Sequence, residues 1–165
     1  MTPAEWAYNT LTISTVSTDN TEWPELSEIQ EELEDLDDMS PLTFYEHCPI
    51  PDVLIETIGS NEPEWLAENR KLCGYSTVHE FCLKEWGCVM DATEVSFIQP
   101  DNHTLVYEFK TRSKPPMAWI KSISSQYPSL MFEIDCINEM ELWDEYEAVY
   151  INGQEVVHHF KKHQR

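Results

Sequence analysis

Hydrophobic and polar residues alternate in several segments of the chain. Between Asn9 and Val16, Leu11 and Ile13 alternate with threonine and serine, which is typical of a half-buried strand. The turn sequence PDNH separates two further alternating segments and indicates a β-hairpin. The alternation therefore predicts four more strands, at 92–99, 104–111, 130–137 and 145–156.

Other segments repeat their apolar residues at helical spacing. Residues 61–74 and 76–87 end in glycine, and the second begins with a capping-box pattern, Thr77 with Glu80. Residues 113–128 begin with a proline pair and carry an apolar stripe. The earliest helix is predicted at 25–38, after Pro24. Its apolar residues lie within an arc of about 80°, and they are Leu26, Ile29, Leu33 and Leu36.

The order of these elements predicts an α+β fold. Without the segment after the first strand, the order is βαββαβ followed by one more strand, as in a ferredoxin-like split βαβ sandwich with helices on one face of an antiparallel sheet. A chain of 165 residues fits a single domain, 1–165. Within it we expect four parts: a first strand region (1–20), an acidic helical insertion (21–75), a ferredoxin-like core (76–157) and a solvated C-terminal tail (158–165).

The charge of the protein is concentrated near its N-terminus. The formal charge is −21, and residues 1–69 contain 17 acids without a single lysine or arginine. Such a surface repels nucleic acids and anionic lipids and attracts basic partners over about 8–10 Å at ordinary salt. The composition therefore argues against direct nucleic-acid or membrane binding.

The segment 25–38 contains eight carboxylates. In one continuous helix their mutual repulsion would cost on the order of 2–4 kcal/mol at low salt. From Glu22 to Asp38 the acids would extend over about 25 Å, at a charge density within the range of a nucleic-acid backbone. A second acidic group between Glu133 and Glu147 would widen this surface. We therefore expect a partner-binding surface formed by Trp23, Glu25, Glu28, Glu31, Glu32, Glu34, Asp35, Asp37 and Asp38.

No known catalytic or cofactor motif is present. The chain has no Gly-rich phosphate loop, GxSxG or HExxH sequence, so we predict no catalytic residues and no cofactor. Two groups contain zinc-ligand residue types but lack paired short spacings, and the acids near position 35 lack the spacing of a calcium loop. We therefore predict no metal site. The first group is His79, Cys82 and Cys88, and the second is His158, His159 and His163. The odd number of cysteines and the polar N-terminus favour a reducing cytoplasm.

The sequence resembles the YubB-type ferredoxin-like family of phage and plasmid proteins over most of residues 6–157. The shared features include the pair Trp86–Gly87 before the first hairpin and the stretch from Thr111 to Pro116 that opens the second helix. The resemblance implies a bacterial mobile-element protein with this fold. It implies no established activity and no iron–sulfur cluster.

Together these features predict a non-enzymatic accessory protein of a phage or mobile element, in the cytoplasm of a bacterial host. Its acidic surface would mimic nucleic acid and inhibit a basic DNA- or RNA-handling protein, such as a restriction, CRISPR or repair enzyme. Two alternatives remain open. One is a structural or regulatory homodimer that uses a sheet edge, with the acids providing solubility. The other is an uncharacterised enzyme.

Overall fold

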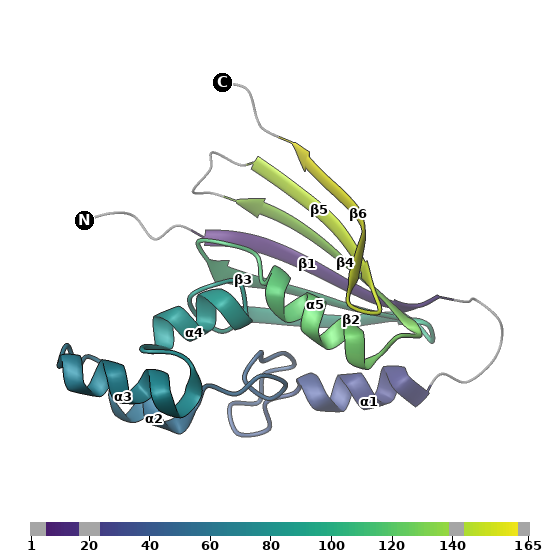
Figure 1. Cartoon of the computed structure of the whole chain (residues 1–165). Coiled ribbons are helices and arrows are strands. Elements are labelled where there is room, and N and C mark those ends of the chain that lie inside the picture. Colours follow the sequence, from purple (N-terminus) through teal and green to yellow (C-terminus); the bar gives the residue numbers. More distant parts are fainter. Residues whose placement is uncertain (1–5, 17–23, 139–143, 162–165) are drawn as a thin grey trace.

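The computed structural model describes residues 6–16, 24–138 and 144–161. It has an α+β fold in which six antiparallel strands form one sheet, in the order β2-β3-β1-β4-β5-β6. Figure 1 shows the helices on one side of this sheet. The strands are β1 (Trp6–Thr15), β2 (Thr93–Asp101), β3 (Thr104–Arg112), β4 (Leu130–Asn138), β5 (Asp144–Ile151) and β6 (Gln154–Lys161). The helices are α1 (Pro24–Leu33), α2 (Asp52–Glu56), α3 (Pro63–Cys73), α4 (Val78–Glu85) and α5 (Met117–Gln126).

The core lies between the sheet and the helices. In β1, β3 and β4 every second residue is buried, as the alternation predicts, and Leu11 and Ile13 are fully inaccessible. The buried residues of these strands pack with the apolar faces of α1, α4 and α5 in one cluster. The intervening residues of the strands point to the opposite face, which is described below as the open face of the sheet.

The acidic insertion contributes directly to this core. Leu42 and Phe44, which follow α1, are buried, and the Phe44 ring contacts both Trp86 and Trp119 at centroid distances of 5.7 and 4.8 Å. Trp86 comes from the end of α4 and Trp119 from α5. The insertion is therefore packed into the same core as the rest of the chain.

The helix predicted at 25–38 is shorter than expected. Leu26, Ile29 and Leu33 are buried as predicted, but α1 ends at Leu33, and Leu36 is 81% exposed. Ending the helix at this point removes most of the predicted contacts between like charges. The buried face of the helix is thus limited to three residues.

The C-terminal region also differs from the prediction. The segment 145–156, interpreted as one strand, is a hairpin of β5 and β6 joined at Asn152 and Gly153, both with positive φ. Asn-Gly is favoured in such two-residue turns because both positions require this conformation. Residues 158–161, assigned to a solvated tail, belong to β6. Pairing with β5 provides the backbone hydrogen bonds that hold them in the sheet.

Two glycines at helix ends provide a test of the packing. Gly74 and Gly87 both have left-handed φ values, +88° and +90°, but a Cβ atom at Gly87 would lie 3.1 Å from the backbone nitrogens of Met117 and Ala118. A Cβ at Gly74 would meet nothing within 4 Å. We expect Gly74→Ala to lower the free energy of unfolding by about 1 kcal/mol through backbone strain alone. Gly87→Ala should cost about 2–3 kcal/mol, because α5 must also move.

Urea unfolding of the two variants measures this difference. Equal losses for both substitutions would contradict the close packing of the α4 end against α5.

Candidate functional site

Helix α1 presents two exposed acids on the side opposite its buried face. Glu28 and Glu31 are exposed, whereas Glu25 is half-buried in the first turn, where a carboxylate interacts favourably with the helix dipole. No basic residue lies in the last turn. Trp23, the predicted aromatic contact, lies outside the described residues. The helix therefore contributes Glu28 and Glu31 to an exposed acidic surface.

Glu32 is engaged in contacts inside the protein. Its carboxylate accepts a hydrogen bond from the Tyr127 hydroxyl, and its Oε1 lies 3.4 Å from Nδ1 of His47, whose side chain is almost fully buried. The other ring nitrogen of His47 lies 3.1 Å from Oγ of Ser122 on α5. Glu32 thus connects α1 to the end of α5, and a partner would have to break these contacts to use it.

This arrangement predicts a stability change at alkaline pH. Burial and, secondarily, the hydrogen bond to Glu32 raise the pKa of Tyr127. The folded protein therefore keeps a proton that the unfolded chain releases above about pH 10, so this stability is complete below that pH and is lost as the pH rises. We expect Glu32→Gln to lower the pKa of Tyr127 and to reduce the alkaline loss of stability.

Absorbance titration of the tyrosines and urea unfolding at pH 9, 10 and 11 test this expectation. Glu31→Gln, one residue away and exposed, is the matched control and should leave both measurements unchanged. If the two variants behaved alike, Glu32 would not be the partner of Tyr127.

The remaining acids of the predicted surface lie at the end of α1 and in a tight turn. Glu34 and Asp35 are half-buried, whereas Asp37 and Asp38 are exposed. The backbone of Asp35 pairs with Ser40 at 2.8 and 3.0 Å, and Asp35 Oδ1 accepts hydrogen bonds from the amides of Asp37 and Asp38. Asp35 is therefore used to form the turn, and Asp37 and Asp38 remain free to meet a partner.

The same turn exposes two apolar side chains that the sequence pattern did not predict at the surface. Leu36 is 81% and Met39 is 88% exposed. Both line a shallow hollow together with Glu34, Asp35, Ser40 and Pro41. The spacing of Leu36 continues that of Leu33 and predicts a buried position, so its exposure differs from the prediction. The turn thus combines acidic and apolar groups at one exposed point.

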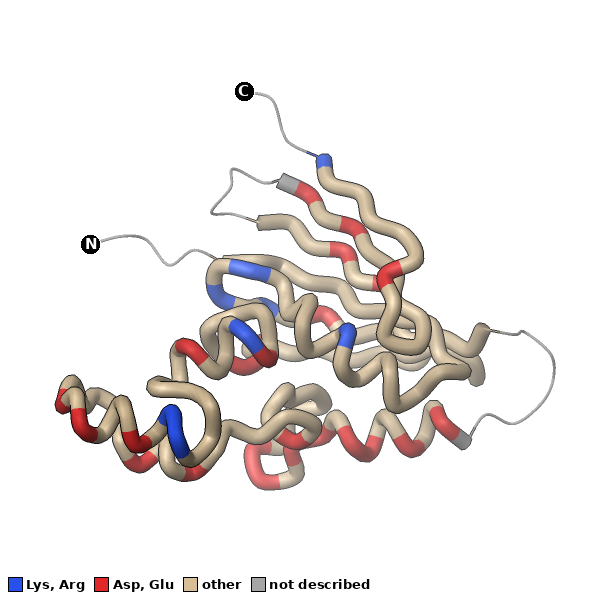
Figure 2. The backbone as a smooth tube through the Cα atoms, in the orientation of Figure 1, with Lys and Arg blue, Asp and Glu red and all other residues tan. Residues whose placement is uncertain are grey.

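Exposed acids continue beyond the turn onto α2 and α3. Figure 2 shows acidic residues along α1, the turn and the two following helices, with the Lys and Arg positions of this region confined to α3. The described part of the insertion up to Asn69 contains no lysine or arginine. We call the exposed acids of this region the acidic face: Glu28, Glu31, Asp37, Asp38, Glu46, Asp52, Glu56, Glu62, Glu64 and Glu68.

The second acidic group lies elsewhere, so the prediction that it widens this surface is wrong. Glu133 and Asp135 alternate with the buried residues of β4 and therefore lie on the open face, away from the helices. Asp135 is opposite Glu147, and burial together with this neighbour raises the pKa of Asp135. The alternation of the strand, together with the packing of α1 on the other face, separates the two groups. Glu139 and Glu141 lie outside the described residues.

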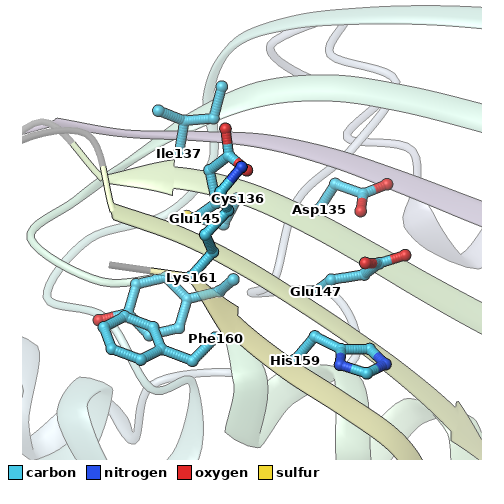
Figure 3. Close-up of a pocket in the computed structure, with 9 residues that line it drawn as sticks. Asp135, Cys136, Ile137, Glu145, Glu147, His159, Phe160 and Lys161 are labelled. Atoms are coloured by element: carbon cyan, nitrogen blue, oxygen red, sulfur yellow. The ribbon is translucent and has the colours of Figure 1, made fainter. Parts of the chain in front are cut away.

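Bases accompany the acids on this open face. Figure 3 shows Asp135, Glu147 and His159 side by side on β4, β5 and β6, with Glu145 and Lys161 beside them. In the register of β5 and β6, His159 is opposite Glu147 and Lys161 is opposite Glu145. The open face is therefore a mixed surface and lacks the uninterrupted negative charge of the acidic face.

The candidate zinc ligands do not form a cluster. Cys82 and Cys88 are buried, and this burial raises the pKa of both thiols, that of Cys82 to about 11. His158 instead contacts Glu155 at 2.8 Å, and His163 lies outside the described residues. Among the described side chains, no group of three His, Cys, Asp or Glu residues could hold a metal ion.

Comparisons with known proteins identify a solved structure with a similar fold. No family model matches the sequence, and a comparison with curated proteins yields no match. None of the described helices has the length and apolar character needed to cross a membrane. Among solved structures, the chain is similar to a protein api92 from Yersinia pseudotuberculosis, of the family DUF1281. The TM-score is 0.60 at 9% identity, over 98% of this chain and 99% of that chain. At this identity the likeness concerns the fold alone, which the two chains share over nearly their whole lengths.

Proposed function

We propose that the protein acts by protein–protein interaction, with the acidic face as a nucleic-acid mimic that inhibits a basic DNA- or RNA-handling protein of a bacterial host. One observation carries this proposal. The described insertion between Glu25 and Glu68 has 14 acids without a single lysine or arginine, and ten of them are exposed. Restriction, CRISPR and repair enzymes have basic clefts of the kind that such a surface fits.

The apolar residues within the acidic region favour a protein partner over a role in solubility alone. Leu36 and Met39 are almost fully exposed between acids, and Trp65 on α3 is 54% exposed. Exposed apolar groups that lie together, as Leu36 and Met39 do around one hollow, mark interaction sites more often than isolated ones. In a complex, the carboxylates would pair with lysine and arginine side chains that otherwise hold phosphates, and the apolar groups would anchor the contact.

We further propose that the sheet and helices include a ferredoxin-like split βαβ unit and that the chain is a mobile-element protein of the YubB type. The order β2-β3-β1-β4, with β1 between β3 and β4 and with α5 connecting β3 to β4, supports the first part. β5 and β6 then extend this unit on the side of β4. The Trp86–Gly87 pair, which is packed against α5, supports the second part.

Charge reversal on the acidic face tests the proposed function. The test variant is Glu28→Lys/Glu31→Lys/Asp38→Lys, because these side chains are exposed and none has a side-chain contact described above. The control is Glu108→Lys/Asp135→Lys/Glu147→Lys on the open face, with the same change in net charge. We expect wild type and control to capture a DNA-handling protein from bacterial lysate and to compete with DNA for the purified partner.

The test variant should no longer compete with DNA for the partner. The amount of partner captured by wild type should decrease steeply as the salt concentration rises to about 0.5 M, since exposed charges are screened there. If the test variant captured the same protein as wild type, the acids would serve solubility only, and a structural or regulatory role without nucleic-acid mimicry would be favoured. An enzymatic role would instead require a ligand bound to the purified protein.

A further inference from the structure

The two edges of the sheet differ in how they are protected from other strands. At one edge, β2 contains Pro100 and two register irregularities, and Glu94 within it has φ +51°. Proline and bulges are common devices that prevent an edge strand from pairing with another chain. At the other edge, β6 is eight residues long and contains no proline. No other described strand pairs with it on the side that does not face β5.

β6 is also exposed along its whole length and carries apolar side chains. Every residue from Gln154 to Lys161 is exposed. Val156, Val157 and Phe160 are 52%, 40% and 51% exposed. The one irregularity lies near the turn, where Val156 has no residue opposite it on β5, and residues 157–161 pair regularly. A long, regular and partly apolar edge of this kind is suited to strand addition.

The local charge permits a second copy of the same chain at this edge. Residues 154–161 contain one acid and one lysine, unlike the protein as a whole, whose formal charge is −21. The acidic face is on α1, α2, α3 and the turn between them, on the helix side of the sheet, whereas β6 is at the sheet edge (Figure 2). Two copies joined through β6 would therefore meet at a segment with little net charge, and neither acidic face would be part of the contact.

The sequence of β6 is complementary to itself in one antiparallel register. With His158 on a two-fold axis, Val157 is opposite His159 of the second copy within the regular part of β6, and Val156, at the irregularity, lies next to Phe160 of that copy. Glu155 and Lys161 then lie at the two ends of the paired segment, where opposite charges of the two copies approach each other. A symmetric contact requires such self-complementarity, since the same surface serves both partners.

From these observations we propose that the protein forms a homodimer by antiparallel pairing of β6 with β6 of a second copy, centred on His158. The two sheets then form one continuous sheet, and each acidic face remains exposed at a distance from the contact. This proposal is independent of the function of the acidic face, and failure of either one leaves the other intact.

A single cysteine on the proposed axis tests both the contact and its register. Residues directly opposite each other in antiparallel strands have Cα atoms about 4.5–5.5 Å apart, within the range that a disulfide bridges. In His158→Cys the two new thiols would be opposite each other and should form an intermolecular disulfide under mild oxidation. In the control His159→Cys they would be two residues out of register, about 8 Å apart, and should not.

Wild-type protein provides the background, because none of its five cysteines forms a disulfide bond. Sedimentation of the wild type should show a dimer that dissociates on dilution. Val156→Lys should raise the dissociation constant of this dimer about tenfold or more, because a lysine on an edge strand opposes pairing. Cross-linking of His159→Cys in place of His158→Cys would overturn the register. A monomer at every concentration, without cross-linking of either variant, would overturn the homodimer.

Discussion

Trp86→Ala is expected to lower the free energy of unfolding by about 3–5 kcal/mol, among the largest effects of any single substitution in this protein. The Trp86 side chain is buried and contacts the rings of Phe44 and Phe81 edge-on. Its indole Nε1 donates a hydrogen bond to the carbonyl of Cys48 at 3.0 Å. The substitution would leave both a cavity and a partly buried carbonyl without this donor, so packing and hydrogen bonding are lost together.

Urea unfolding monitored by circular dichroism measures this loss. The matched control is Trp65→Ala, which removes an exposed tryptophan and should change stability by no more than about 0.5 kcal/mol. Trp86→Phe should fall between the two, since it keeps an aromatic ring and loses the indole N–H. Equal effects of Trp65→Ala and Trp86→Ala would contradict the placement of Trp86 in the core.

Asp91→Ala is expected to cost about 2–4 kcal/mol, because one carboxylate holds the segment that follows the acidic turn. Asp91 accepts hydrogen bonds from the Thr43 hydroxyl at 2.6 Å and from the amides of Phe44 and Tyr45 at 2.7 and 3.3 Å. The amide of Ala92 donates to the same group at 2.7 Å. The loss of this carboxylate would leave polar groups of residues 43–45 unpaired beside the buried Phe44.

Asp91→Asn provides the control, since it keeps an oxygen to accept the Phe44 amide and should cost about 1 kcal/mol or less. Hydrogen exchange of the Phe44 and Tyr45 amides reports the local effect and should accelerate strongly in Asp91→Ala. Slow exchange at both amides in that variant would show that another group holds the segment. If partner binding by the acidic face decreased in parallel with exchange protection, Asp91 would also determine how the turn is presented.

The elements with an uninterrupted pattern were predictable from the sequence. β1, the β2–β3 hairpin and α5 have regular alternation or helical spacing, and turn or proline residues mark their ends. α3 and α4 end where Gly74 and Gly87 predict, and Thr77 accepts a hydrogen bond from the amide of Glu80 as the capping pattern predicts. Local propensity and burial favour the same structure in these segments.

Other features could not be predicted because the sequence pattern was too short or because it favoured two different structures. α2 has only five residues, too few to show a period. The Asn152–Gly153 turn lies within a segment whose apolar residues suggest one strand. In the acidic segment, Leu36 continues the helical spacing, but repulsion among the acids and the hydrogen bonds of Asp35 favour a turn. The spacing of apolar residues gives no information on charge repulsion or on the hydrogen bonds of a turn.

The sequence by itself determined the helical and strand segments with clear periods, the α+β class and the concentration of acids in the insertion. Each of these depends on neighbouring residues or on composition. Only the tertiary structure decided that Glu32 contacts His47 and Tyr127, that the acids of β4 and β5 lie on the face opposite α1, and that β6 forms an exposed edge. These features depend on contacts between residues far apart in the chain, and such contacts form only when the sheet order and the packing of the helices are fixed.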